Sequence, residues 1–480
     1  MYLFLGNQPA MIQTKPFFDG TAEVKNADFR KIWPILGSGK NSGKVEVHFA
    51  QKIRNGAAKS RILLHSSVHP TERPSMEDDD AESFHRAIGP ILALAQWFGV
   101  LPVCGVCLPS PEDLALKKPS LRLLYSVIIS CALLIVASVS FLHMVRTLGA
   151  ETFQVQGGVG AATAGAVFYG NGVLGAILFL WLSPRWIPLQ RQWRAMERLI
   201  DSKHKSVERP RLRWKFLAIV LLVLLPALTE HILSILTNTP DYIWESGNST
   251  FSHFLQVYTE RSHSFLLTTW KYDETVGIFV FIISKIATFI WNFTDLFIML
   301  VSTGLAERYK FLNRRILTML PSSCVVEEWE QFREKYAALS SLVKKVDDNV
   351  SPIILLSFAN NLYFICLQLL NGLSPSEYSL LHSMYFFGSF GFLVGRTIAV
   401  TLLTARINDQ SKMALPALYN CPTPMYRVET QRLLQQLATD EIALTGLRFF
   451  SITRNFMLAV AGAIATYEVV LLQFNVAMKT

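Results

Sequence analysis

The sequence predicts an all-α membrane protein with seven transmembrane helices, a cytoplasmic N-terminus and an extracellular C-terminus. The 480 residues are 51% hydrophobic and only 17% charged, and their mean hydropathy of +0.31 is too high for an ordinary soluble domain. Apolar runs of about 20 residues, the length that crosses a bilayer, occur repeatedly. Positive charge is concentrated in alternate loops. The predicted spans are residues 120–144, 165–187, 214–237, 275–304, 350–371, 380–404 and 453–474.

The charge of the loops predicts the orientation. Nine lysines and arginines lie between Pro184 and Trp214, and eight lie in the loop that follows the fourth span. The alternate loops carry little positive charge: one holds Arg146, and the next holds Arg261 and Lys271. Because cytoplasmic loops carry the excess of positive charge, the N-terminus is predicted to lie inside the cell. The net charge of +9 therefore reflects topology and does not indicate a nucleic-acid surface.

The region before the first span divides into two parts. Residues 1–80 have the composition of a mobile cytoplasmic tail, and they show no cleavable signal peptide. From Ser83 onward an apolar stretch is interrupted by helix breakers, which predicts an extra N-terminal re-entrant or interfacial helix. The breakers are Gly89, Pro90, Gly99, Pro102 and Gly105.

Sequons and cysteines add two constraints. Asn248 begins the one sequon that lies in a loop assigned to the outside, and it is the predicted glycosylation site. Cys104 and Cys107 form a lone CxxC without a second cysteine pair or a histidine couple. We interpret them as buried thiols and predict no metal site.

A helix with one apolar stripe is predicted below the membrane, before the fifth span. Its apolar residues recur at intervals of three and four, which places them on one helix face. That face packs either against the segment from Thr423 to Leu447, which has a helical pattern of its own, or against other copies of the chain as an oligomerisation hub. The stripe consists of Trp329, Phe332, Tyr336, Leu339, Val343 and Val346.

The triplet Glu307-Arg308-Tyr309 imitates a motif of G-protein-coupled receptors. It follows the fourth span instead of the third, and the predicted N-terminus is inside, opposite to those receptors. We therefore interpret the triplet as a charged helix end in water.

Charged residues within the predicted spans suggest two ion pairs, because charges in lipid face a bundle interior and seek partners. At 1.5 Å per residue, Lys285 and Glu230 lie at similar depths in the outer half of the membrane. Asp295 and Arg396 lie together in the inner half. Each pair can form, or each group can be solvated separately in a crevice.

Aromatic and hydrogen-bonding residues gather in the outer half of several spans. Rings can cover the C–H faces of a small polyhydroxylated ligand while buried polar groups satisfy its hydroxyls. Helix–helix hydrogen bonding is the alternative role for any one of these residues. The candidate ligand-binding residues are Tyr169, Glu230, His231, Asn360, Asn361, Tyr363, His382 and Tyr385.

The stretch TYEVVLLQF, residues 466–474, resembles the closing signature of the insect gustatory receptors: a Thr-Tyr pair, five mostly apolar residues and Gln-Phe at the end of the seventh helix. The whole chain from Ser83 onward looks like that family. The stretch from Glu82 to Pro90, with Ala95-Gln96 and Phe98-Gly99 after it, resembles the opening helix of the sugar-sensing branch. Glu468 occupies a position that the signature leaves mostly apolar.

The resemblance implies a ligand-gated cation channel, a homotetramer whose seventh helices surround a central pore. The chain then divides into the tail of residues 1–80 and a channel domain of residues 81–480. Within that domain we expect cytoplasmic anchor helices at about 305–350 and 405–447 and a pore helix at about 448–476.

The terminal motif predicts the pore residues. On a helix, Thr466, Val470 and Gln473 share one face, so apolar rings can close the pore by dewetting while Gln473 lines it when open. We expect Phe474 to form the gate, with a lipid- or neighbour-facing aromatic as the alternative, and Tyr467 to anchor the helix within its own subunit.

The expected function is a sugar-gated non-selective cation channel acting as a taste receptor in the plasma membrane of a chemosensory neuron. Its partners are a small mono- or disaccharide, membrane lipid, permeating cations and other copies of the chain or related receptors. No cofactor and no nucleic acid are expected. An enzyme is not expected, because Gly157–Gly160 lacks the lysine of a phosphate loop. The alternatives are a chemoreceptor for a non-sugar tastant, a receptor signalling through G proteins, and a transporter.

Overall fold

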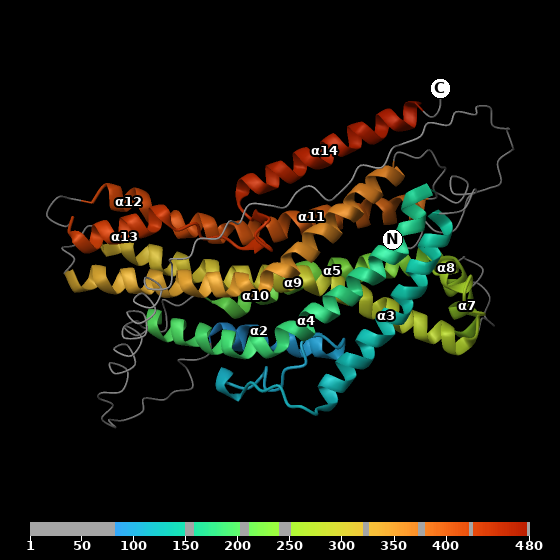
Figure 1. Cartoon of the computed structure of the whole chain (residues 1–480), viewed down its shortest axis with the longest axis horizontal. Coiled ribbons are helices and arrows are strands. Elements are labelled where there is room, and N and C mark those ends of the chain that lie inside the picture. Colours follow the sequence, from blue (N-terminus) through green and yellow to red (C-terminus); the bar gives the residue numbers. More distant parts are fainter. Residues whose placement is uncertain are drawn as a thin grey trace, which may run out of the picture. The chain divides into compact units, whose positions relative to one another are not determined.

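The computed structural model describes residues 82–148, 158–201, 211–239, 251–319, 326–372, 380–421 and 426–477. The predicted tail of residues 1–80 and the Asn248 sequon lie outside the described residues. Seven long helices run through the described part of the chain (Figure 1). They are α3 (Leu121–Leu148), α4 (Gly158–Asp201), α5 (Leu212–Asn238), α9 (Glu274–Met319), α10 (Val326–Gly372), α11 (Leu380–Lys412) and α14 (Arg454–Ala477).

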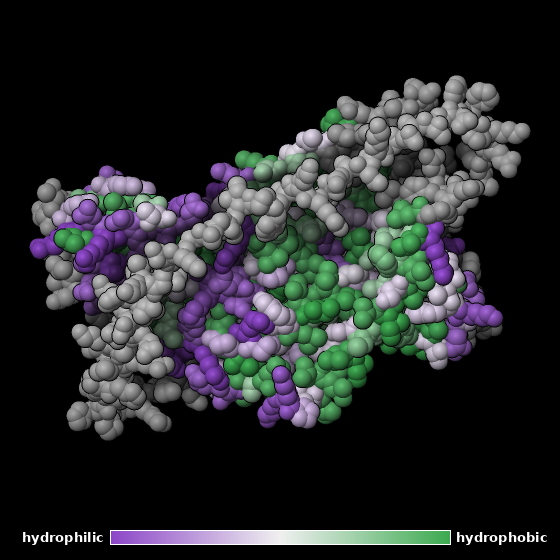
Figure 2. Space-filling view, viewed as in Figure 1, coloured by the Kyte–Doolittle hydropathy of each residue, from purple (hydrophilic) through white to green (hydrophobic). Residues whose placement is uncertain are grey.

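Each predicted span coincides with one of these helices. Among the described residues, α3, α4, α5, α9, α10 and α11 are long and apolar enough to cross a membrane, and α14 carries the seventh predicted run. Four helices, α4, α9, α10 and α11, continue beyond the apolar run at the end that the loop charges assign to the cytoplasm. On the face in Figure 2, hydrophobic residues gather over the middle of α3 and α4, as expected for a lipid-facing surface.

Shorter elements connect the long helices. A short 3-10 helix, η2 (Pro111–Asp113), follows α2 (Phe84–Trp97), and α7 (Phe251–Ser262) and α8 (Ser264–Leu267) precede α9. After α11 come α12 (Leu415–Tyr419), α13 (Val428–Thr439) and a hairpin of β1 (Thr445–Gly446) and β2 (Phe450–Ser451). The hairpin pairs Thr445 with Ser451 and Gly446 with Phe450 in antiparallel register.

Helix α2 is the extra N-terminal helix, and it lies along α9 between Phe289 and Gly304. At its start, Phe84 stacks on Trp193 with ring centroids 3.7 Å apart and packs against Gly304. Just past its end, Phe98 stacks on Phe289, also at 3.7 Å. The two contact points on α9 are 15 residues apart, about 22 Å along the helix axis. This arrangement favours the re-entrant alternative over a helix that lies flat across the bundle.

The return segment after α2 folds back against it. A Cβ atom at Gly89 would lie 2.4 Å from the carbonyl oxygen of Val106, so this breaker permits the close approach of the two backbones. Cys104 pairs with Ala115 through both backbone groups. Cys107 is exposed, so the interpretation as a buried thiol is wrong for that residue.

The predicted apolar stripe of α10 is buried within the chain. All six of its residues, from Trp329 to Val346, are less than 9% exposed. The extension packs against α4, α9 and α13, and two ion pairs join it to the α13 region: Arg333 with Glu429 at 2.7 Å and Lys344 with Asp440 at 3.0 Å. Intramolecular packing is therefore confirmed for this stripe.

The helical pattern from Thr423 to Leu447 was only partly correct. Helix α13 ends at Thr439, and Leu444 lies in the approach to the hairpin. The hairpin is fastened to α10 by Asp347, whose carboxylate accepts the backbone N–H of Thr445 at 2.6 Å and its hydroxyl at 2.8 Å. These contacts offer the backbone an alternative to a further helical turn.

The interpretation of Glu307-Arg308-Tyr309 as a helix end in water was wrong. All three residues are less than 5% exposed, because α9 continues to Met319 and is covered by its neighbours. Glu307 pairs with Lys215 of α5 at 2.5 Å and with Arg406 of α11 at 2.8 Å.

The other two members of the triplet reach two further helices. Arg308 pairs with Glu197 at 2.7 Å and with Asp201 at 3.1 Å, both on α4. Glu197 also accepts the first backbone N–H of α2, from Phe84, at 3.1 Å. The Tyr309 hydroxyl is hydrogen-bonded to Ser340 of α10. The triplet therefore joins five elements at the end of the bundle that the loop charges assign to the cytoplasm.

Candidate ligand site

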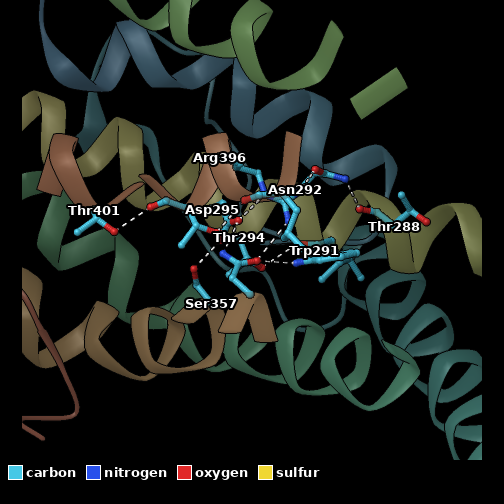
Figure 3. Close-up of polar contacts among 12 residues, drawn as sticks. Thr288, Trp291, Asn292, Thr294, Asp295, Ser357, Arg396 and Thr401 are labelled. Carbon is cyan, nitrogen blue, oxygen red and sulfur yellow. Dashed lines mark hydrogen bonds and ion pairs between the residues drawn. The ribbon is translucent and has the colours of Figure 1, made fainter. Parts of the chain in front are cut away.

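A buried ion pair between α9 and α11 forms the lower boundary of the candidate site (Figure 3). The Arg396 Nε lies 2.7 Å from the Asp295 carboxylate, and both side chains are almost fully buried. Asp295 also accepts hydrogen bonds from the Ser357 hydroxyl at 2.5 Å and from the Asn361 amide at 2.9 Å. The predicted Asp295–Arg396 pair is confirmed, and the separately solvated alternative is excluded.

The same guanidinium is held by amide and aromatic groups. Arg396 donates to Asn292 and, at 3.2 Å, to the Asn361 oxygen, and its guanidinium carbon lies 4.7 Å from the Trp291 ring centroid. The Trp291 indole N–H donates to the same Asn361 oxygen at 3.1 Å. Asn361, a candidate ligand residue, is thus occupied by the ion-pair network. Because the network ties α9, α10 and α11 together, it can act as a rigid floor.

Above this floor, three helices share a hydrogen-bonded chain of side chains. Gln368 of α10 donates to the Ser389 hydroxyl at 3.2 Å, and Ser389 of α11 donates to the Glu230 carboxylate of α5 at 3.0 Å. The Lys285 ammonium instead donates to the Tyr258 hydroxyl at 3.0 Å. The predicted Lys285–Glu230 pair is therefore wrong for the part of the chain that the structure describes.

A second polar cluster joins α4 to the junction between α7 and α8. The Tyr169 hydroxyl is hydrogen-bonded to His263 at 2.9 Å, and the other ring nitrogen of His263 is hydrogen-bonded to Ser262 at 2.6 Å. Burial, with a smaller contribution from the charge of Lys285, lowers the pKa of His263 to about 3. The imidazole is therefore neutral and supports the outer end of the bundle through hydrogen bonds.

Several buried polar atoms of residues on α5, α10 and α11 have no hydrogen-bond partner in the described part of the chain. They are the Tyr385 hydroxyl, both amide atoms of Asn360, one amide oxygen of Gln368 and one ring nitrogen of His231. A buried polar group without a partner costs roughly 1–3 kcal/mol. Since most buried polar groups are paired, these atoms are candidates for bonding by ligand hydroxyls or by water. Further unpaired buried atoms lie elsewhere in the described chain, for example on Gln190 and Thr303.

The predicted ligand residues do not form one cluster in the structure. Four of them lie on α5, α10 or α11, the helices that carry the unpaired atoms: Glu230, His231, Asn360 and Tyr385. Tyr169 belongs instead to the His263 cluster. Tyr363 is hydrogen-bonded to Thr163 of α4 at 2.6 Å. His382 lies on α11, but its side chain is outside the described part.

Sequence reasoning missed Ser357 as a partner of Asp295 and Gln368 as a partner of Ser389. Each carried a spacing signal, because Ser357 stands four residues before Asn361 on α10 and Gln368 seven residues after it, which places all three on one helix face.

Helix α14 lacks the enclosure of the other long helices. Among those of its residues whose side chains are described, from Arg454 to Thr466 and Val469, none is buried. Its base is held by stacking of Phe456 on Phe450 at 4.5 Å and by an ion pair of Arg454 with Asp409 at 2.7 Å. Figure 1 shows the remainder of α14 running free of the adjacent α11. Of the predicted pore residues, Tyr467, Val470, Gln473 and Phe474 lie on this helix, but their side chains are outside the described part.

Comparison with known proteins decides the family. The pattern of the trehalose receptor family matches residues 50–480. The gustatory receptor 5a for trehalose of Drosophila melanogaster is 34% identical over 420 residues, which cover 87% of this chain and 90% of that receptor. The chain belongs to the sugar-sensing branch of the insect gustatory receptors. The gustatory receptor for sugar taste 64f of the same organism is 32% identical over 401 residues, covering 82% of this chain and 81% of that protein.

The fold of this gustatory receptor is shared with solved structures. The insect olfactory receptor OR5 from Machilis hrabei, in complex with eugenol, superposes with a TM-score of 0.58 at 16% identity, covering 82% of this chain and 98% of that one. The structure of OR5 without eugenol gives a TM-score of 0.57, also at 16% identity, over 81% and 97% of the two chains. This gustatory receptor is therefore a multi-pass membrane protein of the same helical fold.

Proposed function

We propose that this gustatory receptor is a sugar-gated, non-selective cation channel in which α14 from four copies of the chain lines a central pore. One observation carries the proposal: α14 is apolar and 24 residues long, yet none of its described side chains is buried. It also carries Thr466, Glu468 and Gln473, which would be costly if lipid surrounded the helix on all sides. Packing of α14 around a water-filled pore with other copies provides both an apolar and a polar environment.

The ligand is proposed to be a small sugar held in the outer half of the bundle between α5, α10 and α11. Its hydroxyls complete the bonding of Tyr385, Asn360, His231 and Gln368, while the Arg396–Asp295 network forms the floor. Drosophila relatives are described as receptors for trehalose and for sugar taste, which supports this ligand class. Asn361, Tyr363 and Tyr169 are assigned supporting roles because their polar atoms already have protein partners.

In the proposed pore, Thr466, Val470 and Gln473 face the axis, Phe474 closes it, and Tyr467 anchors α14 within its own subunit. Residues 448–476 then form the pore helix, and the regions near 305–350 and 405–447 form a cytoplasmic anchor. The extension of α4, α9, α10 and α11 beyond the apolar runs supports a cytoplasmic assembly below the membrane. The tail of residues 1–80 lies on the same side in this scheme.

The proposed orientation places the N-terminus in the cytoplasm, the C-terminus outside, and α2 in the inner half of the bilayer. It rests on the loop charges and on the course of α2 along α9. The proposed location is the plasma membrane of a chemosensory neuron, where a sugar reaches the outer pocket directly.

Whole-cell recording from non-neuronal cells that express this chain alone tests the function. With G-protein signalling blocked, a panel of mono- and disaccharides should evoke rapid cation currents that cells lacking the receptor do not show. Responses that disappear when G-protein signalling is blocked would favour indirect signalling. Surface expression without any current in response to sugars would contradict a sugar-gated homomeric channel.

The variant Tyr385→Phe tests the pocket, because it removes only a buried hydroxyl that has no protein partner. Loss of one ligand hydrogen bond, about 0.5–1.5 kcal/mol, should raise the half-activating sugar concentration about twofold to tenfold without lowering surface expression. Tyr125→Phe is the matched control, since that hydroxyl bonds the Trp97 carbonyl at the inner end of α3. Equal sugar responses of both variants would place the pocket elsewhere.

A further inference from the structure

An open groove of about 610 Å³ lies beside the first turns of α9, separate from the proposed sugar pocket. Its walls come from the middle of α3, from the segment that connects α8 to α9, and from α9 itself. Ile135, Val276 and Phe279 form the apolar part, and Trp270 and Lys271 stand at the other end. The Trp270 ring lies against Phe279, with centroids 6.4 Å apart.

The groove extends from the membrane interface into the hydrocarbon layer. Leu133, two residues before Ile135, packs at Gly172 next to Ala287. Ala287 is 13 residues into α9, about 20 Å from its first residue, so this part of α3 lies well inside the bilayer. Lys271 precedes Glu274, the first residue of α9, and therefore lies at headgroup level. Tryptophan and lysine at this level are typical interface anchors.

We propose that this groove binds one membrane phospholipid, with an acyl chain along Ile135, Val276 and Phe279 and the phosphate at Lys271. Lys271 is exposed, and the acidic Asp273 and Glu274 follow it in the same segment. The segment therefore presents a cation beside carboxylates, which matches the phosphate and the choline of a zwitterionic headgroup. The order of the groups fits as well, since a cation at the interface is followed by an apolar wall at greater depth. A sugar would find few hydrogen-bonding groups on that wall.

The proposal rests on the position of α9 in the membrane and not on sugar gating. In the proposed orientation the lipid belongs to the outer leaflet, and phosphatidylcholine supplies the required phosphate and acyl chains. The segment that holds Lys271 follows α8, whose Phe265 contacts the Tyr169–His263 pair. A bound lipid would thus lie next to the cluster that supports the outer end of the bundle.

Photolabelling of the full-length receptor in nanodiscs tests the site. The probe is phosphatidylcholine with a diazirine on its acyl chain, and labelled peptides are identified by mass spectrometry. We expect label on the peptides that contain Phe279 and Ile135 in excess of the label on α5 around Leu222, a lipid-facing residue that is 70% exposed. Equal labelling of the two regions would show ordinary surrounding lipid only and would overturn the proposal.

Matched variants sharpen the test. Ile135→Trp fills the groove and should reduce its labelling, whereas Leu222→Trp, an equally lipid-facing change outside the groove, should leave it unchanged. Lys271→Gln should reduce labelling by up to about fivefold, the upper range for one exposed ion pair, and Lys271→Arg should retain it. Labelling that resists both Ile135→Trp and Lys271→Gln, or that sugar abolishes, would contradict a lipid site. The test does not measure the sugar-evoked current. Its result therefore bears on the lipid site alone and leaves the channel proposal to its own experiment.

Discussion

Two arginines, Arg308 and Arg396, are buried together with their carboxylate partners. Each guanidinium has more than one acceptor, and each carboxylate has donors besides the arginine. Such pairs contribute little net free energy of folding, because burial of both charges offsets their attraction. Removal of one partner strongly destabilises the fold, because it leaves a charge in a medium that cannot solvate it. The pairs therefore specify which helix faces meet.

Arg396→Met should destabilise the receptor by about 3–5 kcal/mol, because Asp295 then remains buried without its cation. The double variant Arg396→Met/Asp295→Leu should recover much of the loss. Thermal midpoints of the detergent-solubilised receptor, followed by size-exclusion chromatography, measure both effects. Arg448→Met is the control: its pair with Asp348 is exposed, and its loss should cost at most about 1 kcal/mol. Equal losses for the two single variants would contradict the role of the buried pair.

His263 should make the stability of the receptor depend on pH. Its folded-state pKa is lowered to about 3, while an unfolded histidine has a pKa near 6.5. Below about pH 6.5 only the unfolded state takes up the proton, so stability falls as the pH falls from 6.5 toward 3. At pH 5.5 this amounts to about 1.4 kcal/mol.

The thermal midpoint at pH 7.5 and at pH 5.5 measures this dependence. His263→Gln keeps hydrogen-bonding groups but cannot titrate, so its midpoint should change less between the two pH values. His253→Gln, an exposed change on the adjoining helix α7, should leave the difference as it is in the parent. An undiminished pH difference in His263→Gln would exclude this histidine as the source.

For single residues, the sequence predicted the depth of a side chain in the membrane better than the direction in which that side chain points. The arithmetic of 1.5 Å per residue placed Asp295 near Arg396, and they are paired. The same arithmetic placed Lys285 near Glu230, but each faces a different neighbour. Position along a helix follows from the sequence alone, whereas the direction in which a side chain points depends on how the helices are rotated and tilted against one another.

Among the elements, α2 depends on a very close contact with α9. A Cβ atom at Gly304 would lie 2.6 Å from the Phe84 ring, and that ring is also stacked on Trp193. Gly304→Ala should therefore cost about 1–3 kcal/mol through overpacking. Gly391→Ala on α11 meets no atom within 4 Å and should be neutral or stabilising by up to about 1 kcal/mol. Thermal midpoints compare the two; an unharmed Gly304→Ala variant would show that α2 shifts without cost.

Helix α14 carries the prediction about the gate. Phe474→Ala should give a standing cation current without sugar, because removal of four aromatic side chains leaves the closed pore wide enough for water. Tyr467→Phe removes only a hydroxyl, at most about 1 kcal/mol of hydrogen bonding, and should gate nearly normally. Whole-cell recording measures both. The prediction is wrong if the Phe474→Ala channel reaches the surface, carries no current at rest and opens with sugar. In that case Phe474 packs against neighbouring residues or lipid and is not the gate.

The long elements could be predicted from composition, and the short ones could not. Seven apolar runs gave seven helices because a run of that length in lipid has few other ways to satisfy its backbone. The hairpin before α14 gave no such signal. Its strands have two residues each, and its turn places Leu447 and Arg448 at φ values of 49° and 62°, a conformation that these residue types rarely adopt. Contacts with α10, distant in sequence, stabilise it.

For the whole molecule, the orientation in the membrane can be measured directly. An epitope tag after Thr480 should be accessible to antibody on intact cells, and a tag before Met1 should become accessible only after permeabilisation. Asn248→Gln should abolish the mobility shift that glycosidase treatment produces in the parent. Reversed accessibility of the two tags would overturn the proposed arrangement of all the helices.

The homotetramer stays a prediction, and it rests only on the resemblance to the family. Within one chain the apolar stripe of α10 is already buried, so this stripe does not by itself require a second copy. In the proposed channel α14 is covered by other copies, but the sequence pattern of an isolated apolar helix is the same whether lipid or another subunit covers it. Subunit number depends on geometry between chains, which a single sequence does not encode locally.

The two polar centres on α9 also fix the rotation of this helix about its own axis. Asp295 engages α10 and α11, and the triplet that begins at Glu307 engages α4, α5, α10 and α11. The two centres are 12 residues apart, about 18 Å along one continuous rod. One residue inserted between them would turn the lower centre by about 100° relative to the upper one, and both sets of partners could be kept only if the helix absorbed the extra residue as a π-bulge. The length of this stretch is thus under the same constraint as the identity of its charges.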